Sequence, residues 1–110
     1  MSKTTIPDHL IRRFHEVAVE QAFGIVGDFA LRLFSELSNR GFSVLVTTDE
    51  QGAGFAADAY ARIRGFGVVA TTFGVGGLKV ANAAANAWAE RVPLLILSGA
   101  PGVIERKGEP

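Results

Sequence analysis

Two acidic residues, Asp28 and Glu50, each follow a short apolar run with the composition of a buried strand. The carboxyl ends of parallel strands form the edge of an α/β sheet where ligands usually bind. A carboxyl group at that edge could transfer a proton. The alternative for each acid is structural, because an acid at the start of a helix caps free amides and complements the helix dipole. Asp49 is the better cap of the neighbouring pair, which leaves Glu50 available for proton transfer.

Glycines gather in two segments that resemble nucleotide-binding motifs. Segment 65–70 matches G-x-G-x-x-A as a string, but it precedes a strand, whereas the dinucleotide fingerprint follows one. Segment 74–77 follows a strand and precedes a helix, yet Lys79 lacks the adjacent hydroxyl residue of a P-loop. We therefore predict a turn over 74–77. It either lets a flat ligand approach the backbone or is simply a flexible turn.

Helical and strand patterns alternate along the chain, and these elements must position the acids. The predicted helices cover 8–19, 29–40, 50–64 and 78–91, and the predicted strands cover 23–26, 44–47, 68–72 and 94–97. Continuous apolar strands are typical of a parallel sheet covered on both faces. The predicted fold is α/β, a three-layer parallel sheet with helices on both faces and at least four strands. Doubly wound domains usually have five or six strands, so residues 1–110 are expected to form one incomplete domain.

Helical spacing also predicts which side chains face the core. The expected inward residues are Leu10, Phe14, Val17 and Ala18 in the first helix, and Phe55, Ala59 and Ile63 in the third. The third and fourth helices are crowded with Gly and Ala, which lets backbones approach closely. These small residues either pack inside the domain or form an interface with another subunit. The apolar fraction of 48% favours the interface.

Composition excludes several classes of function. Lys plus Arg and Asp plus Glu number 11 each, so the chain lacks the positive field that a nucleic-acid-binding protein needs. The absence of cysteine excludes disulfides and thiolate metal sites. His9 and His15 do not share a helical face and are expected to be solvated. No apolar run approaches the ~20 residues of a membrane span, and no signal peptide is evident. We expect a cytoplasmic protein that contributes no metal ligands.

Five sequence blocks, in order, resemble a known family. They are FGIVGDF at 23–29, EQGAGFAADAYAR at 50–62, TTFGVG at 71–76, ERVP at 90–93 and SGAP at 98–101. Over about residues 20–102, the chain is similar to the N-terminal pyrimidine-binding domain of thiamine-diphosphate-dependent 2-keto acid decarboxylases. Pyruvate, indolepyruvate and phenylpyruvate decarboxylases belong to this group.

The resemblance implies roles for individual residues. Glu50 would hydrogen-bond N1′ of the cofactor aminopyrimidine and share a proton with it, and Asp28 would handle protons on the substrate side. The residues that would line the cofactor pocket are Val26, Gly27, Thr72, Phe73, Gly74 and Gly76. The resemblance also implies a 2-keto acid substrate, a homo-oligomer, and a diphosphate-binding domain from another subunit that carries Mg²⁺.

Two alternatives remain open beside the decarboxylase. The Glu50-Gln51-Gly52 motif also occurs in acetolactate-synthase-like carboligases, although the Asp of Gly-Asp-Phe is typical of decarboxylases. The chain could also be a non-catalytic interaction module that retains only the subunit interface. The family's adjacent histidine pair and its diphosphate-binding domain are not within the 110 residues. We therefore expect half a site, with no turnover and weak cofactor binding by the 110 residues alone.

Overall fold

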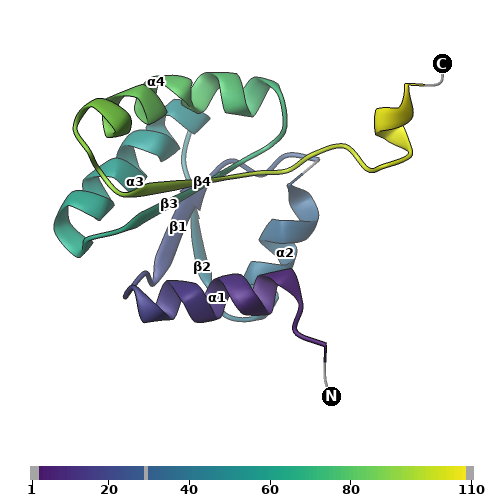
Figure 1. Cartoon of the computed structure of the whole chain (residues 1–110), viewed down its shortest axis with the longest axis horizontal. Coiled ribbons are helices and arrows are strands. Elements are labelled where there is room, and N and C mark those ends of the chain that lie inside the picture. Colours follow the sequence, from purple (N-terminus) through teal and green to yellow (C-terminus); the bar gives the residue numbers. More distant parts are fainter. Residues whose placement is uncertain (1–2, 29, 109–110) are drawn as a thin grey trace.

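The chain folds into three layers, with a parallel sheet between two pairs of helices (Figure 1). The computed structural model describes residues 3–28 and 30–108. Within them the helices are α1 (Ile6–Glu16), α2 (Leu31–Asn39), α3 (Glu50–Arg64) and α4 (Val75–Ala89), followed by a short 3-10 helix η1 (Glu105–Lys107). The strands are β1 (Gln21–Gly24), β2 (Ser43–Val46), β3 (Gly67–Thr71) and β4 (Leu94–Ser98). The predicted fold class is confirmed.

The order of the strands in the sheet is β2-β1-β3-β4, and every pairing is parallel. The two central strands pair through Phe23 with Val69 and Gly24 with Ala70. From β1 the chain continues outward to β2, whereas from β3 it continues to β4 on the opposite side. The connections therefore diverge between the carboxyl ends of β1 and β3. In parallel sheets this switch point forms a crevice in which ligands bind.

Apolar side chains fill both faces of the sheet. On the face covered by α1 and α2, the core consists of Phe14, Val19, Ala22, Leu37, Phe42 and Val68. On the face covered by α3 and α4, it consists of Phe23, Ala53, Ala57, Val69 and Val80. The first core is dominated by large side chains. The second consists mainly of alanine and valine, which brings α3 close to the sheet.

Local signals define the helix ends. Thr5 and Asp8 form a capping box at the start of α1, and Pro7 lies in its first turn. Gly65 ends α3 in the left-handed conformation, with φ of 92°. Arg40 is the C-cap of α2, and Gly41, the next residue, has a positive φ of 75°.

Two predicted helical segments differ from the structure. The first helix ends at Glu16, so Val17 and Ala18 lie beyond it and are exposed, and Ala18 has a positive φ of 57°. The fourth helix begins at Val75 rather than at 78. Only Gly74, with φ of 75°, forms the predicted turn, because Gly76 and Gly77 adopt helical geometry in the first turn of α4. The predicted start of the second helix, Phe29, lies outside the described residues.

The predicted inward face of α3 is wrong. Phe55, Ala59 and Ile63 are exposed, and Ile63 retains 83% of its accessible surface. The buried residues of α3 are Ala53, Gly54, Ala57, Asp58 and Ala61. Since α3 packs directly against α4 and the sheet, only small side chains fit between them, and the large apolar residues are displaced outward.

In the part of the chain that the structure describes, no helix has both the length and the apolar character needed to cross a membrane.

Candidate functional site

Glu50 is the first residue of α3 and follows the carboxyl end of β2. The capping role belongs to its neighbour, because the Asp49 carboxylate accepts a hydrogen bond of 2.6 Å from the amide of Gly52. This bond, together with Lys79 at 3.5 Å, lowers the pKa of Asp49. Glu50 is half-buried, and no described residue forms a hydrogen bond or ion pair with its carboxylate. Its side chain is therefore available to a ligand.

Glu50 lies against the start of α4. A Cβ atom built on Gly76 would lie 3.3 Å from Glu50 Oε1 and 3.1 Å from Thr72 Cγ2. On the other side of Thr72, a Cβ on Gly27 would lie 2.5 Å from the Thr72 Cβ. The threonine side chain is thus held between two glycine backbones. We refer to Gly27, Glu50, Thr72 and Gly76 as the Glu50 cluster.

The Glu50 cluster lies at the switch point of the sheet. Gly27 follows β1, Thr72 follows β3, and Gly76 belongs to the first turn of α4. Two loops and the starts of two helices, α3 and α4, therefore meet at the Glu50 carboxylate. Gly27 and Gly76 pack against Thr72, whereas the positions beside Gly74 and Gly77 are open, so a flat polar ligand could approach the backbone there.

The other predicted site residues lie around this cluster. Asp28 is exposed in the turn after β1, and neither a hydrogen bond nor an ion pair between described residues joins it to Glu50. Val26 lies on the α2 side, where it lines a groove with Leu31, Phe34 and Val46. Phe73 and Gly74 are exposed in the loop that links β3 to α4. The structure thus brings four of the eight predicted residues together and leaves the other four at the margin.

A polar network lies deeper in the same helix pair and was not predicted from the sequence. Asp58 is 4% exposed and accepts hydrogen bonds from Arg62 Nε at 2.6 Å and Asn86 Nδ2 at 3.3 Å. Arg62 also reaches Glu90, at 3.5 Å. The sequence contained a signal, because Asp58 and Arg62 are four residues apart and therefore adjacent on a helix. Asp58 also lies on the same face as the small residues Gly54 and Ala61.

The outer faces of α3 and α4 expose large apolar side chains. Besides Phe55 and Ile63, Leu78 and Trp88 are 78% and 88% exposed. The small residues of these helices divide into two sets. Those facing inward pack within the domain, as Gly54 does against Val80 and Ala83. Those facing outward, which include Ala59, Ala81, Ala85 and Ala89, remain on the surface with the large apolar side chains.

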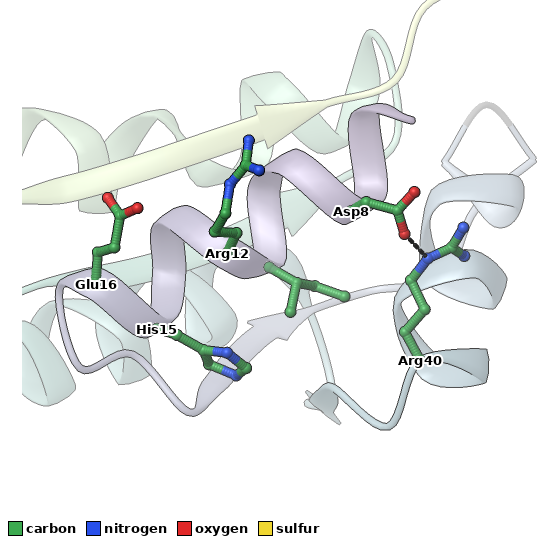
Figure 2. Close-up of a pocket in the computed structure, with 6 residues that line it drawn as sticks. Asp8, Arg12, His15, Glu16 and Arg40 are labelled. Atoms are coloured by element: carbon green, nitrogen blue, oxygen red, sulfur yellow. Dashed lines mark hydrogen bonds and ion pairs between the residues drawn. The ribbon is translucent and has the colours of Figure 1, made fainter. Parts of the chain in front are cut away.

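A shallow hollow on α1 lies on the opposite face of the sheet and contains none of the predicted site residues. It is lined by Asp8, Ile11, Arg12, His15, Glu16 and Arg40. Figure 2 shows the Asp8 and Arg40 side chains pointing toward each other, with the Asp8 Oδ1 to Arg40 Nε bond of 2.5 Å drawn between them. His15 and Glu16 point in different directions. The polar groups that meet in the hollow, Asp8 and Arg40, pair with each other, so the Glu50 cluster, whose carboxylate has no partner among the described residues, is the better candidate site.

Comparison with known proteins identifies the family of the chain. Residues 4–109 match the family model described as the thiamine pyrophosphate enzyme, N-terminal TPP binding domain. The chain is 45% identical over 98 residues to pyruvate decarboxylase 3 of Oryza sativa subsp. indica, covering 88% of the chain and 17% of that protein. It is 40% identical over 98 residues to the alpha-keto-acid decarboxylase of Mycobacterium tuberculosis, covering 88% of the chain and 18% of that protein. The chain thus spans less than a fifth of the length of these relatives. It belongs to the family of N-terminal TPP-binding domains of thiamine pyrophosphate enzymes.

Proposed function

We propose that this chain is the pyrimidine-binding part of a thiamine-diphosphate-dependent 2-keto acid decarboxylase, in which Glu50 acts on the cofactor aminopyrimidine. The observation that carries the proposal is the position of Glu50. Its carboxylate is half-buried, faces Gly76 at the sheet switch point, and has no hydrogen-bond or ion-pair partner among the described residues. The decarboxylase names of the relatives support the same reaction class.

The residues present fit such a group. An aminopyrimidine is flat and has a basic ring nitrogen, so it needs a carboxyl group at its edge and unobstructed backbone along its face. Glu50 supplies the carboxyl group, and no heavy atom lies within 4 Å of a Cβ built on Gly74 or Gly77. When bound, thiamine diphosphate supplies the electron sink for loss of carbon dioxide from a 2-keto acid. Glu50 would hold a proton at N1′ and return it, and Thr72 and Gly76 would orient the ring beside it.

Asp28 has the second proposed role. It is exposed at the carboxyl end of β1, next to Gly27 of the Glu50 cluster. From there a carboxyl group could exchange protons with a substrate outside the cluster. Val26, Phe73 and Gly74 would form the margin of the cofactor pocket. This assignment follows the family resemblance and the position of each residue around the cluster.

We further propose that another subunit completes the site. The exposed apolar side chains of α3 and α4, with Trp88 and Ile63 the most exposed, are suited to a protein partner rather than to water. The partner would be the diphosphate-binding domain of a homo-oligomer, which would hold Mg²⁺. On this basis the 110 residues alone would bind thiamine diphosphate weakly. A calorimetric titration that gave tight, magnesium-dependent binding to the 110 residues would contradict this.

The proposed function is tested by Glu50→Gln in the intact protein that contains this domain. Gln keeps the size of the side chain and one carbonyl oxygen but cannot exchange the proton. We expect turnover of pyruvate, measured with saturating thiamine diphosphate and Mg²⁺, to fall by about 100-fold or more, with unchanged thermal unfolding. Glu20→Gln is the matched control, because Glu20 is an exposed carboxylate paired with Arg64 outside the cluster. Wild-type turnover by Glu50→Gln would refute the assignment.

A further inference from the structure

α3 and α4 lie side by side and contact each other at four successive levels (Figure 1). Glu50 lies beside Gly76 at the first level, and Gly54 packs against Val80 and Ala83 at the second. At the third level Asn86 donates a hydrogen bond to Asp58, and at the fourth Arg62 pairs with Glu90. Residue numbers rise together along both helices, so the helices run parallel. Each level on α3 is four residues, about 6 Å, from the next.

The four levels differ in how well they can fix the position of α3 along α4. The Gly54 level is apolar, and apolar contact has no preferred direction along the helix axis. It allows close approach but resists sliding weakly. Hydrogen bonds depend on distance and angle, so the Asp58 level is sensitive to axial displacement. A buried polar contact that fixes register between two helices is a well-attested use of such groups.

Asp58 is suited to this role. It is the only buried charged residue in the described part of the chain, and both of its carboxylate oxygens are engaged. One oxygen accepts from Arg62 of its own helix, and the other accepts from Asn86 of α4. Arg62 continues to Glu90 on α4, so the network joins the helices at two levels. A displacement of α3 along α4 would break the Asn86 and Glu90 contacts and leave one oxygen of the buried Asp58 carboxylate without its partner, although the Arg62 bond within α3 would remain.

We propose that Asp58, held by Arg62 and Asn86, is a positioning residue that sets the register of α3 on α4 and thereby places the Glu50 carboxylate beside Gly76. The inference rests on the proposed function of Glu50. Asp58 touches no ligand in this scheme. It acts from the middle of α3 to fix the Glu50 carboxylate, which lies about two turns away at the start of the same helix.

A double-mutant cycle on cofactor binding tests the proposal. The dissociation constant of thiamine diphosphate is measured by calorimetry on the intact protein with Mg²⁺ present, for wild type, Asp58→Asn, Glu50→Ala and the double variant. We expect Asp58→Asn to weaken binding by about three- to tenfold, because it displaces Glu50. Glu50→Ala should weaken binding by about tenfold or more through loss of a charge-assisted hydrogen bond. The double variant should bind within about twofold of Glu50→Ala.

Each outcome has a distinct meaning. Unchanged binding by Asp58→Asn, when Glu50→Ala is impaired, overturns the positioning role and leaves the proposed function intact. An equal loss from Asp58→Asn with and without Glu50 also overturns it, because the loss is then a general structural effect. Unchanged binding by Glu50→Ala refutes the proposed function itself.

Two further variants keep the test decisive. Asp8→Asn is the matched control, because Asp8 also pairs with an arginine but lies on α1, on the opposite face of the sheet (Figure 2). It should bind the cofactor within about twofold of wild type. Where Asp58→Asn does not fold, Arg62→Gln replaces it in the cycle, since the Arg62 side chain is 44% exposed. Arg62→Gln is expected to weaken cofactor binding in the wild-type protein but not in the Glu50→Ala background. A loss of the same size in both backgrounds overturns the proposal.

Discussion

The two helical layers of this domain are built differently. The α1–α2 layer covers the sheet with large side chains, such as Phe14 and Leu37, and turns charged residues to solvent. The α3–α4 layer covers it with Ala and Gly, buries Asp58, and exposes large apolar residues such as Ile63 and Trp88. The α1–α2 layer distributes its charged and apolar side chains as a water-exposed surface does. The α3–α4 layer distributes them as a helix pair packed on both sides does.

The difference bears on the candidate site, because Glu50 belongs to the α3–α4 layer. Small residues in α3 and α4 let the two helices approach closely, because the backbone of Gly54 packs against the side chains of Val80 and Ala83. The carboxylate of Glu50 is carried by this closely packed layer. The α1–α2 layer, which lacks predicted site residues apart from the groove beside Val26, contributes chiefly stability.

The stability of the protein should depend strongly on a large side chain of the α1–α2 layer and hardly at all on one of the α3–α4 layer. Phe14→Ala should lower the free energy of unfolding by about 3–5 kcal/mol, because Phe14 is 2% exposed and its removal leaves a cavity. Ile63→Ala, in the other layer, should change it by about 0.5 kcal/mol or less, since Ile63 is already in solvent. Urea denaturation of both variants provides the measurement. Similar losses at both positions would mean that the outer face of α3 is covered within the domain.

Addition of a single methyl group should distinguish the packed contact between α3 and α4 from an open position in the same layer. A Cβ at Gly54 would lie 2.5 Å from the Ala83 Cβ, so Gly54→Ala should destabilise the protein by about 1–3 kcal/mol. Gly77→Ala is the control, because it is also helical but meets no atom within 4 Å. It should stabilise by about 0.5–1 kcal/mol. Thermal unfolding that gave the same sign for both variants would contradict close packing of α3 on α4.

The smallest expected effect concerns acid stability of the α1–α2 layer. The Thr5 hydroxyl and the Arg40 guanidinium lower the pKa of Asp8 from 3.8 to about 2. Since the folded-state pKa is below the unfolded value, the Asp8 contribution is present above pH 3.8 and is lost as the pH falls toward 2. The difference in unfolding temperature between wild type and Asp8→Asn should therefore narrow across this range. The effect is modest because the pair is exposed, and a constant difference would exclude this ionisation as its source.

The sequence predicted the layers of the fold better than the packing within them. The continuous apolar strands were sufficient to predict a parallel sheet, and strand boundaries shift by no more than two residues. The inward face of α3 was wrong because Phe55 and Ile63 form a regular stripe that helical periodicity assigns to the core. Whether a large side chain or an alanine faces inward depends on the distance to the neighbouring helix. That distance cannot be predicted from the sequence of one helix alone.

The candidate site was also predictable only in part, because some of its residues are placed by local sequence and others by contacts between distant segments. Glu50, Thr72 and Gly76 follow strand ends, so topology places them at one edge of the sheet, and Asp49 serves as the predicted cap. The order β2-β1-β3-β4, which makes Gly27 and Thr72 neighbours, depends on pairing between strands distant in sequence. The Asp58–Asn86 bond is equally non-local.

The paired contacts along α3 and α4 also restrict where residues can be inserted into this chain or deleted from it. One residue inserted between Glu50 and Asp58 would rotate the two by about 100° and shift them by about 1.5 Å relative to each other. Glu50 could not then remain beside Gly76 while Asp58 remained beside Asn86. A deletion in the corresponding part of α4 has the same result. Insertions and deletions should therefore be excluded from these two helices and tolerated in surface segments such as the turn at Gly41 between α2 and β2.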